Sequence, residues 1–210
     1  MAAAPKLETL VPLSEELQFV HASARDEYGR VYITRIAFPQ GRHEGDLKEH
    51  WGNLYRPENS LLLLRGQAVD YASDVEDLLH EVLALYLEQR ALGIDLLRKQ
   101  IKDNTAAECA VRKLDFMGRK NLLSSILGKD KLLGGKNGYT KLLNDIILDR
   151  NKYAHGKFYF HVGESVTVIQ WKLGETKKCA KIEPDLLQGF ADCCLSAYEW
   201  LSSLKNQLSS

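Results

Sequence analysis

The chain has 210 residues, of which 45% are hydrophobic and 27% charged, as in an ordinary globular protein of one domain or one domain with an appendage. A chain of this length buries a sufficient core without disulfide or metal staples. The formal net charge is zero, which excludes a chain-wide attraction to nucleic acid or membrane but not a local basic patch.

Three further observations bear on the cellular compartment. The cysteines Cys109, Cys179, Cys193 and Cys194 show no C-x-x-C spacing, so we expect reduced thiols. The N-terminal residues have no apolar segment long enough for a signal peptide, and the longest apolar run, residues 61–64, is too short to cross a bilayer. We therefore expect a cytoplasmic protein with no membrane partner.

Residues 1–58 give the weakest pattern in the chain. The β-branched and aromatic stretch 29–39 lies between Gly29 and Pro39 and predicts a strand. His43 and His50 lie in the polar segment that follows, but their spacing matches no metal-binding motif, so we expect surface residues and no metal site. We interpret residues 1–58 as an N-terminal extension of mixed α/β character and unclear fold.

Residues 59–99 give the strongest helical pattern, because apolar side chains recur at helical spacing between Tyr71 and Tyr86. A second, acidic stripe runs along the same helix through Asp70, Asp74, Asp77 and Glu81. This stripe is typical of a face turned toward water.

Two more helices are predicted at 105–127 and 139–154, joined by a glycine-rich loop. The segment 112–141 carries eight basic residues against Asp115 and Asp130, which is the electrostatic footprint of an RNA-binding face. A solvated surface, or pairing with the acidic stripe, explains the same pattern. The basic residues are Arg112, Lys113, Arg119, Lys120, Lys129, Lys131, Lys136 and Lys141.

The period changes after residue 156, where two or three short strands are predicted between 157 and 183, followed by a last helix over 185–207. The predicted fold is mainly α: a bundle of four to five helices at 59–210, with a small β-hairpin inserted before the last helix. No cofactor is expected.

The segment DRNKYAHG, residues 149–156, ends the third helical pattern with residues suited to phosphate chemistry. Histidine exchanges protons near neutral pH, and arginine grips a phosphate through two donors. On a continuous helix Arg150 and His155 point about 140° apart, whereas Asn151 and His155 share a face. A helix that unwinds before a left-handed Gly156 brings His155 toward Arg150. Favourable placement of cations at a helix C-terminus explains the same residues without catalysis.

DRNKYAHG resembles the R-x4–6-H motif of the HEPN superfamily, with a polar residue after the arginine and a small residue before the histidine. The segments 70–87 and 114–128 look like the HEPN helices that precede this motif. This resemblance covers roughly residues 60–207 and implies a HEPN-like helical domain at 59–210.

The resemblance implies a metal-independent endoribonuclease in which two motifs face each other across a homodimer cleft. Arg150 would then stabilise the phosphate, His155 would act as general acid or base, and Asn151 would orient one of them. Glu76 or Asp77 are the candidates for an acidic residue in this cleft. The residues expected to contact RNA are Lys157, Arg119, Lys120 and Lys152.

Two functions of different classes are open. The first is a HEPN ribonuclease, for which a role as a toxin or phage-defence effector and a nucleotidyltransferase-like antitoxin partner are implied. The second is a non-catalytic HEPN module for dimerisation, RNA binding or regulation. The intact set Arg150, Asn151 and His155 favours the first, and the long N-terminal extension favours the second.

Overall fold

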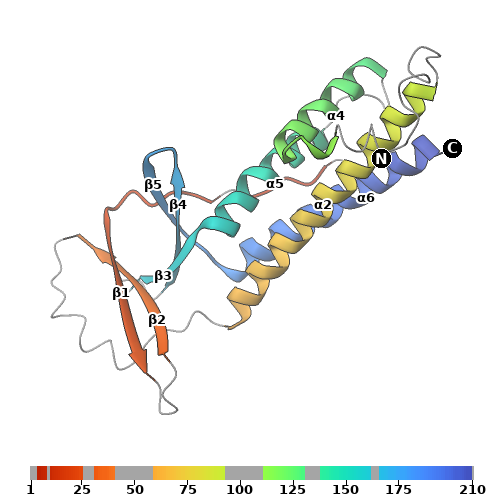
Figure 1. The fold of residues 1–210 in the computed structure, drawn as a ribbon. Coiled ribbons are helices and arrows are strands. Elements are labelled where there is room, and N and C mark those ends of the chain that lie inside the picture. The colour runs from red at the N-terminus through yellow and green to blue at the C-terminus, as the bar shows by residue number, and fades with distance from the viewer. Residues whose placement is uncertain are drawn as a thin grey trace. The chain divides into compact units, whose positions relative to one another are not determined.

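A computed structural model of the chain describes residues 4–8, 10–25, 31–40, 59–92, 111–130, 138–161 and 166–209. Four named helices and five strands lie within these residues (Figure 1). No described helix is both long enough and apolar enough to cross a membrane. In chain order the elements are β1 Leu17–Arg25, β2 Val31–Pro39, α2 Asn59–Leu92, α4 Phe116–Asp130, α5 Gly138–His155, β3 Lys157–His161, β4 Val166–Leu173, β5 Thr176–Lys181 and α6 Pro184–Ser209.

The chain divides into two compact units, each built from segments that are distant in sequence. The helical unit comprises Met1–Leu7, Ala68–Arg150 and Gly189–Ser210. The sheet unit comprises Glu8–Gln67 and Asn151–Gln188. The helices α2, α5 and α6 each contribute residues to both units.

Apolar side chains at helical spacing form the core of the helical unit, as the periodicity predicts. Val75, Leu79 and Val82 on α2 are buried, and α5 and α6 bury matching stripes. Tyr139 of α5 stacks on Trp200 of α6 with ring centroids 5.0 Å apart. The helices predicted at 139–154 and 185–207 are confirmed, with ends shifted by one or two residues.

The sheet unit is built on one five-stranded mixed sheet in the order β1-β2-β3-β4-β5. The strands β1 and β2 pair antiparallel, β2 runs parallel to β3, and β3, β4 and β5 form an antiparallel meander. Both faces of β2 are covered, because Ala37 packs with Tyr159 and Val168 while Ile36 packs with Phe38 and Val20. The sheet is therefore the centre of this unit.

The predicted fold class is wrong. A helical bundle with one inserted hairpin and a separate N-terminal extension does not describe a chain in which strands β1 and β2 join β3, β4 and β5 in one sheet. The contact that joins the two groups of strands is the parallel pairing of Ile36 with Phe160 and of Ala37 with His161. In the sequence, the helices α2, α4 and α5 lie between these paired residues. Local hydrophobic periodicity carries no information about a pairing between such distant segments.

The unwinding that would bring His155 toward Arg150 does not occur at the end of α5. The Gly156 amide donates to the Lys152 carbonyl over 2.7 Å, so helical hydrogen bonding continues to the end of α5. Gly174, in the β4–β5 turn, is the one described glycine with a positive φ. A Cβ on Gly156 would lie 2.4 Å from the Lys152 carbonyl oxygen and 2.6 Å from the Ile169 side chain. Glycine is required here by the close approach of the helix end to β4.

Candidate functional site

The residues of the DRNKYAHG segment lie at the C-terminal end of α5, and the boundary between the two units falls after Arg150. Arg150 belongs to the helical unit, whereas Asn151 and His155 belong to the sheet unit.

In the helical unit three of the predicted site residues come together. The Glu76 carboxylate accepts a hydrogen bond from Arg119 over 3.1 Å and lies 3.9 Å from the Arg150 guanidinium. We call Glu76, Arg119 and Arg150 the Glu76 cluster. Its side chains are 12–28% exposed, so the pairing is only partly screened by water.

The Glu76 cluster holds two cations for one carboxylate. The closer of its two ion pairs belongs to Arg119, and the Arg150 Nε is buried without a hydrogen bond to a described residue. The cluster therefore carries surplus positive charge on Arg150, which is the side chain expected to bind phosphate. An anion there would receive hydrogen bonds from a guanidinium that Glu76 already orients.

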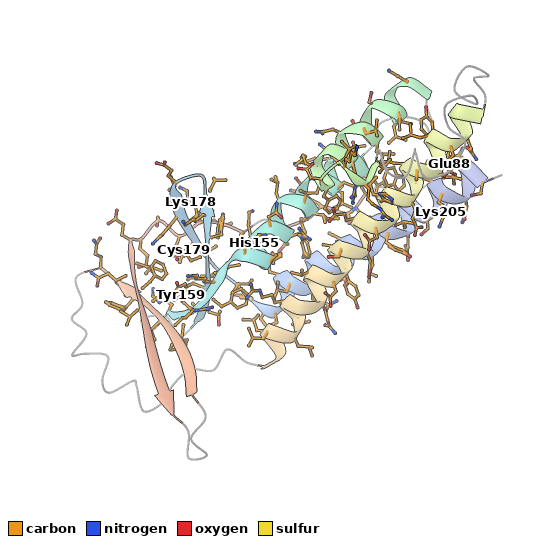
Figure 2. The ribbon with its side chains drawn as sticks, in the orientation of Figure 1. Glu88, His155, Tyr159, Lys178, Cys179 and Lys205 are labelled. Carbon is orange, nitrogen blue, oxygen red and sulfur yellow. The ribbon has the colours of Figure 1, made fainter. Side chains whose placement is uncertain are left out.

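In the sheet unit, Asn151 and His155 are both exposed and are separated by one helical turn. Tyr153 between them is fully buried, which anchors this end of the helix. The Lys152 ammonium lies 5.6 Å from the centre of the Trp171 ring on β4. Figure 2 labels His155 on the last turn of α5.

Arg65 of α2 holds the backbone on both sides of His155, a role that sequence reasoning missed. Its guanidinium donates to the carbonyls of Tyr153, Ala154 and Gly156 over 2.7, 3.1 and 3.0 Å, and it lies over the Phe158 ring at 4.8 Å. These carbonyls include the last ones of α5, which have no partner within the helix. A cation at this negative helix end is also favoured by the helix dipole.

Burial, together with Arg35 of β2, lowers the pKa of Arg65. Three carbonyl acceptors and an aromatic face compensate for this unfavourable environment. An arginine directly after the apolar run of residues 61–64 was the sequence signal for such a role.

The remaining predicted residues lie elsewhere. Lys157 is exposed at the start of β3, and Lys120 donates to the Asn144 side chain over 3.4 Å in the helical unit. Asp77 is exposed and lines a pocket that Arg119 also borders. The candidates Lys131, Lys136, His43 and His50 lie outside the described residues.

The pocket beside Asp77 has a volume of about 540 Å³ and lies in the helical unit. Its lining balances three acids with three cations, and Lys205 donates to Glu81 over 2.7 Å, which raises the pKa of Lys205. Glu88 on α2 and Lys205 on α6 are labelled in Figure 2. Because its charges compensate one another, the pocket has no clear preference for an anion or a cation. The charged lining residues are Asp77, Glu81, Glu88, Arg112, Arg119 and Lys205.

The described cysteines are unsuited to nucleophilic chemistry. Cys193 and Cys194 are buried on α6, and burial raises the pKa of both thiols. Burial and Glu15 likewise raise the pKa of Cys179. These thiols stay protonated at neutral pH, and the protonated form is the unreactive one.

Comparisons of the chain with protein-family models, with curated proteins and with solved structures give no match. The likeness to the HEPN superfamily is accordingly a resemblance of motif and helix pattern.

Proposed function

We propose that this chain is a metal-independent endoribonuclease of the HEPN type, acting at the interface of a homodimer. The observation that carries the proposal is the joint exposure of Asn151 and His155 on one face of α5, at a helix end that Arg65 and buried Tyr153 hold in place. A titratable imidazole on a rigid, accessible support is what proton transfer to a bound substrate needs.

In the proposed reaction the RNA 2′-oxygen attacks the adjacent phosphorus, and the bond from phosphorus to the 5′-oxygen breaks. The imidazole of His155 takes the proton of the 2′-hydroxyl, and His155 of a second copy protonates the leaving 5′-oxygen. Arg150 stabilises the charge that develops on the phosphate, and Asn151 orients the histidine or the phosphate. The products are a 2′,3′-cyclic phosphate and a 5′-hydroxyl.

The Glu76 cluster supports the role of Arg150, because it holds a guanidinium with surplus charge in a partly buried environment. The resemblance extends the proposal to a toxin or phage-defence effector, with a nucleotidyltransferase-like antitoxin as the partner that restrains it. Lys152 and Lys157 are proposed to contact the RNA backbone, because both are cations in the same unit as His155.

A second candidate is a non-catalytic HEPN module that binds RNA or a partner protein. The observation that favours it is the engagement of Arg150 with Glu76, since a guanidinium held by a carboxylate must be released or shared before it binds phosphate. In this case the motif maintains the fold and the dimer.

The test is cleavage of a fluorescent single-stranded RNA in EDTA by the full chain, by His155→Ala and by the control His80→Ala. His80 lies on α2 in the helical unit and has no part in the proposed reaction. We expect His155→Ala to lose cleavage by at least about 100-fold, the usual contribution of a general acid or base. The control should cleave normally, and product ends should carry the cyclic phosphate.

Equal cleavage by His155→Ala would exclude the proposed enzyme, as would a chain that stays monomeric by light scattering at micromolar concentration. Binding of RNA without cleavage by any variant would favour the non-catalytic module.

A further inference from the structure

The β4–β5 hairpin carries an unusual arrangement of lysines. Lys172 on β4 lies directly opposite Lys177 on β5, and both side chains are exposed. Like charges at directly opposite positions on one face of a sheet are destabilising. The chain therefore places two cations together at a cost to its own stability.

Neighbouring acids do not neutralise this arrangement. Glu175, in the turn, is the single acid of the hairpin, and none of the ion pairs among the described residues involves Lys172, Lys177 or Lys178. Lys177 and Lys178 border a pocket of about 390 Å³ together with Glu15 and Glu16. Glu15 is already paired with buried His161 over 2.9 Å.

The opposite face of the hairpin also carries cations, because successive side chains of a strand point to opposite faces of the sheet. Lys178 lies directly opposite Trp171, so the two share a face, and the Lys152 ammonium lies over the ring of the same Trp171. Lys152 is three residues before His155 on α5, so these two side chains occupy adjacent turns. Figure 2 labels Lys178, beside Cys179 on β5, and His155.

Protection of a sheet edge is the simpler explanation for lysines on β5, because edge strands commonly carry lysine to prevent further pairing. It does not account for Lys172, which lies on the inner strand β4. The edge of β5 is also partly covered, since the Leu13 amide donates to the Cys179 carbonyl over 2.8 Å and Pro12 bridges to Ala180.

We propose that the β4–β5 hairpin holds the phosphate backbone of single-stranded RNA on the face that carries Lys172 and Lys177, with these two lysines as phosphate contacts. The identity of the polyanion as RNA rests on the proposed function. A phosphate between Lys172 and Lys177 turns their mutual repulsion into two attractions. This surface is distinct from the basic segment 112–141, whose described residues belong to the helical unit.

The experiment measures binding to a fluorescent 20-nucleotide RNA by anisotropy, in EDTA and at several salt concentrations. All chains carry His155→Ala, which keeps the RNA intact. The hairpin variant adds Lys172→Gln and Lys177→Gln. The control variant instead adds Lys113→Gln and Lys141→Gln, which remove two exposed lysines of the helical unit.

We expect the hairpin variant to reduce the slope of log affinity against log salt by about 1.4, since each of its two phosphate contacts on a single strand contributes about 0.7. At 0.1 M salt this corresponds to roughly 10- to 100-fold weaker binding. The control variant should keep the parent slope. The hairpin variant should be at least as stable as the parent in thermal unfolding, because the substitutions remove a repulsion.

An unchanged slope in the hairpin variant overturns this inference. If the control variant loses the slope instead, RNA binds to the helical unit and the proposed nuclease stands. If the His155→Ala chain does not bind RNA and the unmodified chain does not cleave it, the proposed function fails together with the inference.

Discussion

The two units treat their charged side chains in different ways. In the helical unit the cations Arg119, Arg150 and Lys205 all lie within ion-pair distance of carboxylates on α2. On the β4–β5 hairpin of the sheet unit, Lys172 and Lys177 face each other instead of an acid. Charges that are paired within a unit stabilise it, whereas charges that repel each other are available to an external anion. The difference separates cations that are paired within the fold from cations with no ion pair among the described residues; Arg150 belongs to the first group although it is also proposed to bind phosphate.

The largest effect is expected at Arg65, a cation of the sheet unit whose guanidinium donates hydrogen bonds to three carbonyls. Arg65→Met keeps much of the side-chain volume but removes the donors to three carbonyls at the end of α5. We expect a loss of about 3 kcal/mol in the free energy of unfolding, measured by urea titration. Lys172→Gln, a cation without an ion pair, is the control and should change it by less than about 0.5 kcal/mol. Equal losses of stability in Arg65→Met and Lys172→Gln would show that the hydrogen bonds of Arg65 do not stabilise the fold.

The next largest effect tests pairing in the helical unit. Glu76→Gln leaves two partly buried guanidinium groups without their carboxylate, and we expect a loss of about 2 kcal/mol in the free energy of unfolding. Glu81→Gln removes the exposed partner of Lys205 and should cost at most about 0.5 kcal/mol. A Glu76→Gln chain as stable as Glu81→Gln would show that the Glu76 cluster does not stabilise the fold.

A smaller effect concerns alkaline pH. Burial raises the pKa of the Cys194 thiol above its value in the unfolded chain, about 8.5. Below that pH both states keep the proton, and above it the unfolded chain ionises first, so stability falls as pH rises. By pH 9.5 the loss from this thiol should reach about 1.4 kcal/mol in urea titrations, and Cys194→Ala should remove this part of the dependence while the parts due to Cys179 and Cys193 remain. Fast alkylation of Cys194 in the folded chain at pH 8 would contradict the assignment.

The smallest effect on stability is expected at the Lys172–Lys177 pair of the β4–β5 hairpin. Lys177→Glu turns the repulsion across from Lys172 into an attraction, so thermal unfolding at low salt should show a gain of about 0.5 kcal/mol. The same substitution should weaken RNA binding, because it removes a proposed phosphate contact and adds a negative charge. A Lys177→Glu variant that is less stable and binds RNA as before would show that Lys172 and Lys177 do not repel each other and that Lys177 does not contact phosphate.

Much of the helical unit was predictable because its pattern is local. Residues three and four apart on a helix share a face, so the apolar spacing of α5 and α6 indicated both elements within two residues at either end. Two or three strands between 157 and 183 were predicted because the pattern of a strand is also local, and three are present. The strand β1 was missed, because LQFVHASAR lacks a clear alternation.

The pattern of residues along the chain was enough to predict the helices α5 and α6 and the strands after residue 156, but not β1, and it placed Arg150, Asn151 and His155 at the end of one helix. Only the tertiary structure decided that Ile36 pairs with Phe160, that Glu76 lies beside Arg119 and Arg150, and that Arg65 binds the carbonyls around His155. Each of these contacts joins residues far apart in the chain. Spacing along a sequence reports the period of one element, and it contains no term for the packing energy that selects the partner of that element.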